Sequence, residues 1–294
     1  MEVNLQTETF YFRGSLSCKF MQLSVIVTTY NSPDWLQKVI WGYSVQSFRD
    51  FELLIADDGS KEDTRQLIDA LRNEVSFPIQ HIWQEDKGFR KCTILNKAII
   101  ASGADYLAIS DGDCIPRNDF LEIHFNKRRA GYFLSGGYNK LPMDLSKQIT
   151  KEDIETQRCF DVDWLTKHGL EKSFTSSKLR VAGWKASLLN NLTPTNASWN
   201  GHNSSAWKKD ILAINGFDER MRYGALDREM GERLMNNNIK GLQIRYSAVC
   251  LHLDHSRGYK NEVDLAANAA IRERTKNENL TWTDYGIVQE SQSL

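Results

Sequence analysis

Three short apolar runs in the first half of the chain each end in polar turn residues. They span residues 23–29, 51–56 and 106–110 and are rich in β-branched side chains. Runs of this length and composition, bounded by turn residues, are typical of fully buried strands. Segments with helical spacing of apolar residues lie between them, which predicts parallel strands joined by right-handed crossovers. We therefore predict an α/β fold in which helices flank a mixed, mostly parallel central sheet.

Acidic residues directly follow two of these predicted strands. Asp57 and Asp58 follow the second strand, and Asp111 and Asp113 flank Gly112 after the third. Ligands of open α/β sheets bind beyond the carboxyl ends of the strands, so these carboxylates should face one crevice. Divalent cations such as Mg²⁺ prefer oxygen ligands and bridge carboxylates to phosphates. The pattern indicates a site for a metal-bound diphosphate; a plain turn, or a helix cap, would explain the same residues.

Composition narrows the class of protein further. The chain has 37 Lys and Arg against 38 Asp and Glu, a net charge of −1, which argues against a nucleic-acid-binding protein. Its 5 cysteines are scattered and form no CxxC pair, as in reduced intracellular proteins. We expect a cytoplasmic protein, attached at most peripherally to the inner face of the cell membrane. The triplet Lys127-Arg128-Arg129 is either a solvated cluster or a membrane or acceptor contact.

An ordered set of motifs carries a family resemblance. VIVTTYN is followed by ADDGS, by QEDKGFR at residues 84–90, and by SDGDC; residues 201–234 form a longer block from GHNSS to GERL. Over most of residues 21–255 these motifs resemble the GT-A fold glycosyltransferases of family 2, with a C-terminal galactosyltransferase-like block. The fold implied is a Rossmann-like nucleotide-binding half joined to an acceptor-binding half.

The resemblance also implies an activity. It implies inverting, metal-dependent transfer of a sugar from a nucleotide-diphosphate sugar, with a UDP-sugar favoured, to a hydroxyl of a glycan or lipid-linked glycan acceptor. The family analogy places this reaction in bacterial surface polysaccharide or lipopolysaccharide synthesis. Asp227 matches the family's general base, and its alternative role is to cap the predicted helix over residues 227–236.

Ligands for the cation and the donor follow from the same resemblance. Mn²⁺ or Mg²⁺ would be held by Asp113 and His252, and His255 is the next candidate ligand. The nucleotide-sugar ligands would be Thr29, Tyr30, Asn31, Asp58, Lys87, Arg90, Asn96, Asp111, Gly112 and Asn203. The two histidines follow a predicted strand over residues 241–249.

Five segments are predicted along the chain. Residues 1–20 are a leader or arm, 21–137 the nucleotide-sugar-binding half, and 138–198 a helical insertion or lid. Residues 199–260 form the acceptor-binding and catalytic half, and 261–294 a helical tail. The oligomeric state stays open.

Two positions depart from the family pattern and keep other functions open. Leu226 stands where many relatives carry Glu, which favours a catalytically inactive GT-A glycan-binding protein. Trp207 is either a sugar-stacking platform or a core residue. A nucleotidyltransferase also pairs carboxylates on an α/β sheet, but it usually carries a Gly-rich, basic phosphate loop, which residues 28–32 lack.

Overall fold

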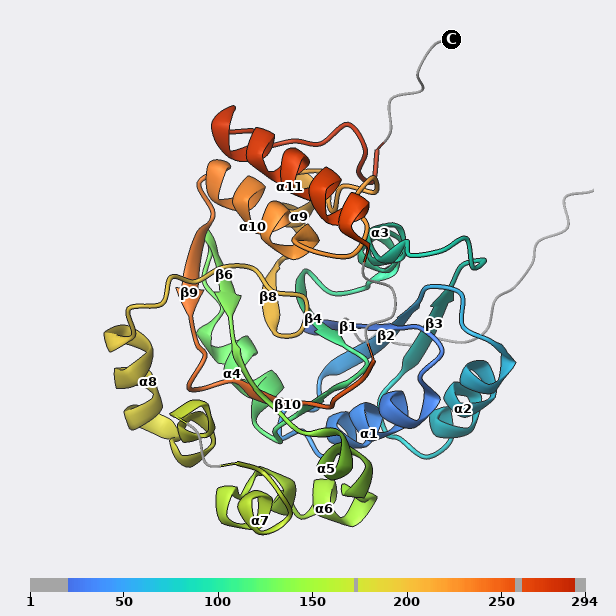
Figure 1. Cartoon of the computed structure of the whole chain (residues 1–294), viewed down its shortest axis with the longest axis vertical. Helices are drawn as coiled ribbons and strands as arrows, with labels where there is room; N and C mark the ends of the chain where they lie inside the picture. The colour runs from blue at the N-terminus through green and yellow to red at the C-terminus, as the bar shows by residue number, and fades with distance from the viewer. Residues whose placement is uncertain (1–20, 172–173, 257–260, 289–294) are drawn as a thin grey trace, which may run out of the picture.

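A computed structural model describes residues 21–171, 174–256 and 261–288, so the predicted leader lies outside the described residues. These residues form a seven-stranded sheet in the order β3-β2-β1-β4-β8-β6-β9 and a three-stranded sheet in the order β5-β10-β7 (Figure 1). The strands of the large sheet are β1 (Leu23–Thr29), β2 (Phe51–Asp57), β3 (Ile79–Trp83), β4 (Tyr106–Asp111), β6 (Tyr132–Ser135), β8 (Ser204–Trp207) and β9 (Lys240–Gln243). The small sheet consists of β5 (Cys114–Pro116), β7 (Gly137–Lys140) and β10 (Val249–His252).

Helices connect and cover these strands. They are α1 (Pro33–Ser44), α2 (Glu62–Arg72), α3 (Lys91–Ala101), α4 (Phe120–Lys127), α5 (Met143–Gln148), α6 (Lys151–Glu155), α7 (Val162–Lys167), α8 (Gly183–Leu192), α9 (Lys208–Ala213), α10 (Leu226–Asn236) and α11 (Glu262–Asn277). Two short 3₁₀ helices, η1 (Arg158–Phe160) and η2 (Phe174–Arg180), lie on either side of α7. No helix among the described residues has the length and apolar character needed to span a bilayer.

The parallel core forms because both faces of its strands are apolar. β1 pairs in parallel with β2 and β4, and every residue of β1 and β2 is buried. Val25 and Val27 pack with α1 and α2, while Ile26 packs with α3 and α10 on the other face. Successive strand residues point to opposite faces, so a strand covered by helices on both sides needs apolar residues throughout. β8 runs antiparallel to β4 and β6, which makes the sheet mixed as predicted.

The single strand predicted over residues 241–249 is wrong. The structure has β9 in the large sheet and β10 in the small sheet, joined by a turn in which the Ser247 N–H donates to the carbonyl of Ile244. The Asn190 side chain accepts from the Tyr246 N–H at 2.8 Å and fixes this turn. The polar residues 245–247 therefore end one strand and redirect the chain into the other sheet.

The segment between residues 142 and 192 is helical, in line with its predicted character. Helices α5 to α8 occupy it, and its described residues contain no strand. Lys38 of α1 donates to the carbonyls of Ser146 and Lys147 at 2.7 and 3.0 Å, which ties α5 to the core. Its assignment as a lid stays a prediction.

A buried ion pair joins the last two helices. Glu229 and Arg233 of α10 are both 1% exposed and lie 2.8 Å apart. Arg233 also donates to the Ile214 carbonyl at 2.6 Å, and the Thr275 hydroxyl of α11 donates to Glu229 at 2.9 Å. Every charged atom of the pair thus has a partner, which is the condition for tolerating charge in a core.

We predict that Arg233→Ala lowers the free energy of unfolding by about 3–5 kcal/mol, because it leaves the Glu229 carboxylate buried without its cation. Chemical denaturation measures the loss. Arg274→Ala is the matched control, because Arg274 pairs with Glu278 at the same spacing on the solvent side of α11. An exposed pair contributes little; equal losses in the two variants would contradict the prediction.

Candidate functional site

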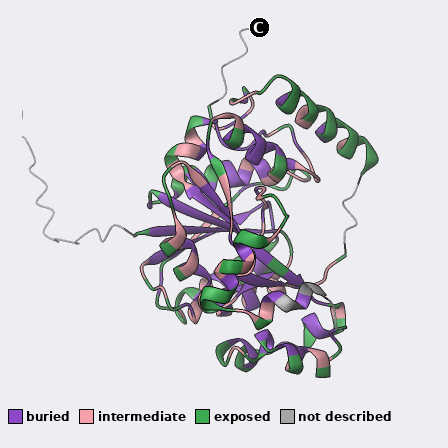
Figure 2. Ribbon diagram, turned by 90° about the vertical axis from the view of Figure 1, so that its left-hand side faces the viewer, coloured by how far each residue is buried: buried purple, intermediate pink, exposed green. Residues whose placement is uncertain are grey.

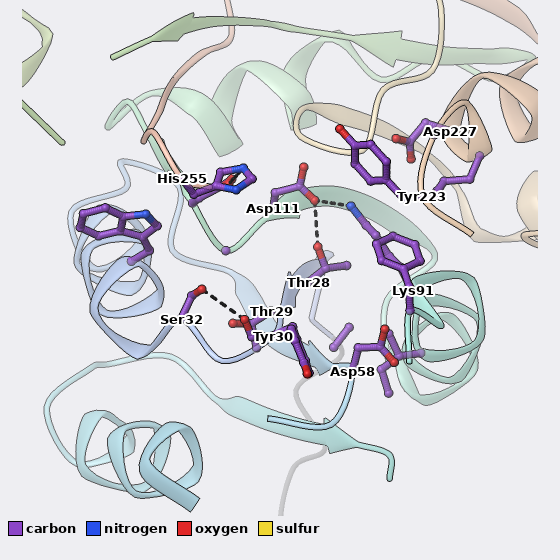
Figure 3. Close-up of a pocket in the computed structure, with 18 of the residues that line it drawn as sticks. Thr28, Thr29, Tyr30, Ser32, Asp58, Lys91, Asp111, Tyr223, Asp227 and His255 are labelled. Carbon is purple, nitrogen blue, oxygen red and sulfur yellow. Dashed lines mark hydrogen bonds and ion pairs between the residues drawn. The ribbon is translucent and has the colours of Figure 1, made fainter. Parts of the chain in front are cut away.

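A cleft of about 580 Å³ lies at the carboxyl ends of β1, β2 and β4 (Figure 3). The loop after β1, the residues after β2 and β4, the start of α3 and the start of α10 line it. The predicted site residues that the structure brings together here are Thr29, Tyr30, Asp58, Asp111, Gly112, Asp113, Asp227, His252 and His255.

Asp111 and Lys91 form an ion pair at the centre of the cleft. The Lys91 ammonium lies 2.5 Å from Asp111 Oδ1, which also accepts from the Thr28 hydroxyl at 2.8 Å (Figure 3). Burial alone would raise the pKa of Asp111, but the neighbouring ammonium holds that pKa below its usual value. Burial alone would lower the pKa of Lys91, but the carboxylates of Asp111 and Asp227 raise that pKa above its usual value. Both groups therefore stay charged.

Lys91 is the main cleft residue that the sequence analysis missed. Lys87 and Arg90 were predicted as the cations of this loop, yet neither lines the cleft. Lys87 pairs with Glu85 at 2.9 Å, where both side chains are exposed. The Arg90 guanidinium donates to the Glu85 carbonyl at 2.7 Å. Lys91 is the first residue of α3 and lines the cleft, whereas the sequence predicts that helix over residues 92–101.

Gly112 brings the acidic loop against the end of β1. Its N–H donates to the Thr28 carbonyl at 2.7 Å, and a Cβ at this position would also lie 2.7 Å from that oxygen. A side chain would force the two backbones apart, which is one of the situations that requires glycine. The residue thereby fixes the spacing between Asp111 and Asp113 on one side and β1 on the other.

Asp58 is held in the cleft by two donors. Gln84 Nε2 lies 2.6 Å from Oδ1, and the Arg90 N–H lies 2.7 Å from Oδ2. Burial raises the pKa of this carboxyl. The alternative that Asp58 or Ser60 caps the next helix is wrong, because the N-cap of α2 is Lys61 and no side chain caps it.

Asp227 lines the cleft, and one of its carboxylate oxygens is enclosed beside Gly201. Its Oδ1 atom is buried and has no hydrogen-bond partner among the described residues. Burial raises the pKa of this carboxyl to about 6, and the charge of Lys91 opposes that shift. Gly201 permits the close approach, since a Cβ there would lie 2.7 Å from Oδ1. Asp227 does not cap α10, because the N-cap of this helix is Ala225 and no side chain caps it.

Asp113, His252 and His255 form a candidate metal centre. The Nε2 atoms of His252 and His255 lie 3.9 and 3.1 Å from Asp113 Oδ2, and the three potential ligand atoms lie within 4.8 Å of one another. The Nδ1 atoms lie 2.8 Å from the Leu253 carbonyl and 2.9 Å from the Ser256 carbonyl. A carbonyl only accepts, so Nδ1 carries the proton and Nε2 is the ring nitrogen that could bind a cation.

Strand pairing builds this centre. His252 of β10 lies opposite Cys114 of β5, and the Leu253 N–H donates to the Asp113 carbonyl at 2.8 Å. A second possible group consists of Asp111, Asp113 and Cys114. Burial raises the pKa of the Cys114 thiol, which disfavours the thiolate that a metal requires. The donor set of Asp113 and the two histidines fits a divalent cation better.

Three predicted ligands lie away from the cleft. Asn96 is buried and binds the Phe217 backbone from both ends of its amide, at 2.9 and 2.8 Å. Asn203 is fully buried; its amide donates to the Gly137 carbonyl at 2.8 Å, and its oxygen lies 2.8 Å from His124 Nε2. Asn31 accepts from the Lys61 N–H at 2.9 Å and lines a neighbouring groove instead. The contacts of these residues join parts of the fold.

The structure also places Leu226 and Trp207, the two residues that depart from the family pattern. Leu226 is 4% exposed and packs in the core with α3 and α10, although one edge of it reaches the cleft. Trp207 packs edge-to-face against Tyr106, with ring centres 5.2 Å apart, and does not line the cleft. The aromatic residues that do line it are Tyr30, Trp35, Phe89 and Tyr223.

Known proteins resemble this chain in sequence. The family model described as glycosyl transferase family 2 matches residues 24–152. The chondroitin synthase of Escherichia coli is 24% identical over 273 residues, which cover 85% of this chain and 37% of the synthase. A GalNAc(5)-diNAcBac-PP-undecaprenol beta-1,3-glucosyltransferase of Campylobacter jejuni is 24% identical over 207 residues, 69% of this chain and 62% of that protein. The chain thus spans only part of the length of either relative.

Solved structures resemble the fold. A mannosyltransferase, PcManGT from Pyrobaculum calidifontis in complex with GDP-Man and Mn²⁺, gives a TM-score of 0.54 at 15% identity, covering 81% of this chain and 58% of that one. TarS 1-349 of S. aureus in complex with UDP-GlcNAc gives 0.54 at 16% identity, covering 81% and 60%. Residues 24–152 thus match glycosyl transferase family 2, and the chain has the GT-A fold, as its motifs and sheet predicted.

Proposed function

We propose that this protein is an inverting, metal-dependent glycosyltransferase that moves a sugar from a UDP-sugar to a hydroxyl of a glycan acceptor. The observation that carries the proposal is the placement of the Asp227 carboxyl group in the same cleft as Asp113, His252 and His255. A base and a diphosphate site must face one another across the sugar for a single displacement.

Asp227 is the general base of the proposed reaction. A carboxyl with a pKa of about 6 is a stronger base than an ordinary aspartate and is still mostly ionised at neutral pH. Glu229, the next carboxylate of α10, is bound to Arg233 and does not line this cleft. In this proposal no side chain acts as a nucleophile, so the acceptor hydroxyl attacks the anomeric carbon directly and inverts its configuration.

Asp113, His252 and His255 hold Mn²⁺ or Mg²⁺ in this proposal. When bound, the cation neutralises the departing diphosphate as a Lewis acid. Asp58, Thr29 and Tyr30 bind the nucleoside end, where an acidic residue after a strand accepts from ribose or base donors. Tyr30 is 49% exposed and offers its ring as a stacking surface.

The pathway and location are proposals from the relatives. One relative is named for chondroitin synthesis and another for transfer to an undecaprenol-linked glycan. Both names support a glycan or lipid-linked glycan acceptor in bacterial surface polysaccharide synthesis, at the inner face of the cell membrane. The inactive glycan-binding alternative rests on the missing acid at Leu226, a core residue whose edge reaches the cleft.

The activity is tested with a panel of nucleotide sugars, with and without Mn²⁺, and with the anomeric configuration of the product read by NMR. We expect Mn²⁺-dependent turnover of a UDP-sugar and an inverted product. A retained configuration, or donor binding without hydrolysis or transfer for any sugar, would contradict the proposal.

Asp227→Asn should lower the transfer rate by about two to four orders of magnitude, because it removes the proton acceptor and keeps the shape. Binding of UDP with Mn²⁺, measured by calorimetry, should survive, since other residues hold the diphosphate. The melting temperature should not fall. A wild-type rate in this variant would place the base elsewhere.

The pH dependence of kcat/KM should report the same carboxyl. Only the ionised form of Asp227 accepts a proton, so kcat/KM should fall as pH drops through about 6, the pKa of the buried group. The residual activity of Asp227→Asn should lack this acidic limb. An unchanged limb in that variant would assign it to another group.

The metal centre is tested by the Mn²⁺ concentration needed for half-maximal activity. Asp113→Ala should abolish metal-dependent UDP binding, and His252→Ala and His255→Ala should each raise the concentration by about tenfold or more. His168→Ala is the control, since His168 stacks on Trp164 away from the cleft. An unchanged requirement in both cleft variants would leave the cation to Asp113 and the donor.

A further inference from the structure

Helix α8 carries its apolar residues on the outside. Trp184, Leu188 and Leu192 are 72, 49 and 68% exposed. Their spacing of four residues places them in one stripe along the helix. The inward side holds Ala186 and Asn190, and the Asn190 amide binds Tyr246 N–H and Ser247 Oγ at 2.8 Å each. Polar contacts therefore hold the helix on the molecule and leave its apolar stripe free, the reverse of an ordinary surface helix.

The stripe lies on an open side of the molecule. α8 lies at the left-hand edge in Figure 1, beside β9 and the turn that leads to β10. Figure 2 turns this side toward the viewer. Exposing several adjacent large apolar side chains to water costs free energy. A contiguous exposed apolar patch of this kind therefore indicates a contact surface.

Basic residues border the stripe. Lys127 at the end of α4 donates to Ser187 Oγ at 3.3 Å, and the Lys185 ammonium lies 5.8 Å from the Trp184 ring centre. Arg128 and Arg129 follow Lys127 in the chain. None of these four cations belongs to an ion pair recorded for the described residues.

Acidic residues are missing from the segments that build this side. The sequence has no Asp or Glu between Glu122 and Asp144, or between Glu171 and Asp210. The whole chain is nearly neutral, with a net charge of −1, so positive charge is concentrated here. A surface that combines an exposed apolar stripe with free cations matches a bilayer of anionic lipids, because apolar side chains enter the interface while ammonium groups contact phosphates.

We propose that the α8 surface, formed by Lys127, Trp184, Lys185, Leu188 and Leu192, docks this protein onto an anionic phospholipid bilayer. Trp184 lies at the headgroup level, where an amphipathic ring is favoured, and the two leucines enter the acyl boundary. Docking needs neither donor nor metal, so it stands or falls apart from the transfer reaction.

Sedimentation of the full chain with vesicles tests the proposal. Vesicles of phosphatidylcholine with about one quarter phosphatidylglycerol are compared with pure phosphatidylcholine, at low and high salt. The wild type should bind the anionic vesicles and lose most of this binding in high salt. Combined Trp184→Ser, Leu188→Ser and Leu192→Ser should lower the partition coefficient by about tenfold or more.

A second variant keeps the apolar stripe and removes charge. Lys127→Gln with Lys185→Gln should bind anionic vesicles no better than neutral ones. Matched controls are Val263→Ser, which removes a 75% exposed apolar residue on α11, and Lys97→Gln, which removes an exposed cation on α3; both should bind like the wild type.

Three results would overturn the proposal. The wild type could fail to bind anionic vesicles, or both variants could bind them as the wild type does. A wild type that sediments as a dimer without binding vesicles, and that the triple substitution converts to a monomer, would make the stripe an interface between copies.

Discussion

The ion pair between Lys91 and Asp111 is the interaction on which the cleft depends. The Lys91 ammonium lies against Asp111 and close to Asp227, two carboxylates that are far apart in the sequence. Lys91 begins α3, and a cation at a helix N-terminus is unfavourable unless carboxylates compensate for it. Asp111 in turn could not stay ionised in this setting without a cation. The loop after β4 and the start of α10 are therefore joined electrostatically as well as by packing.

The small sheet supplies the other constraint on the site. β10 pairs antiparallel with β5 and parallel with β7. Because β5 directly follows the acidic loop, its pairing with β10 places His252 next to that loop. Asn203 connects this sheet to α4, because its amide contacts the carbonyls of Gly137 and Ala248 on one side and His124 on the other. The position of His252 relative to Asp113 is thus set by backbone pairing.

The features that the sequence predicts correctly are those that depend on a few adjacent residues. Continuous apolar strands and the acids that follow them give the parallel core and the placement of Asp58, Asp111 and Asp113, since both are properties of a few adjacent residues. Lys91 escaped prediction because a shift of one residue in a helix start decides which cation points inward. Asn203 escaped because a polar residue that crosslinks a core and one that binds a ligand look the same without the fold around them.

Asp227 shows how the same burial acts on stability and on reactivity. Its pKa of about 6 lies above that of an unfolded aspartate, so the folded state holds its proton more tightly. Folding therefore gains from this group below the unfolded pKa, and the gain is lost as pH rises through the folded value. At neutral pH the protein keeps a buried carboxylate with one oxygen unpartnered, at a cost in stability. In the proposed reaction, an acceptor hydroxyl that donates to this carboxylate removes part of that cost, and it does so at the group that takes up the proton.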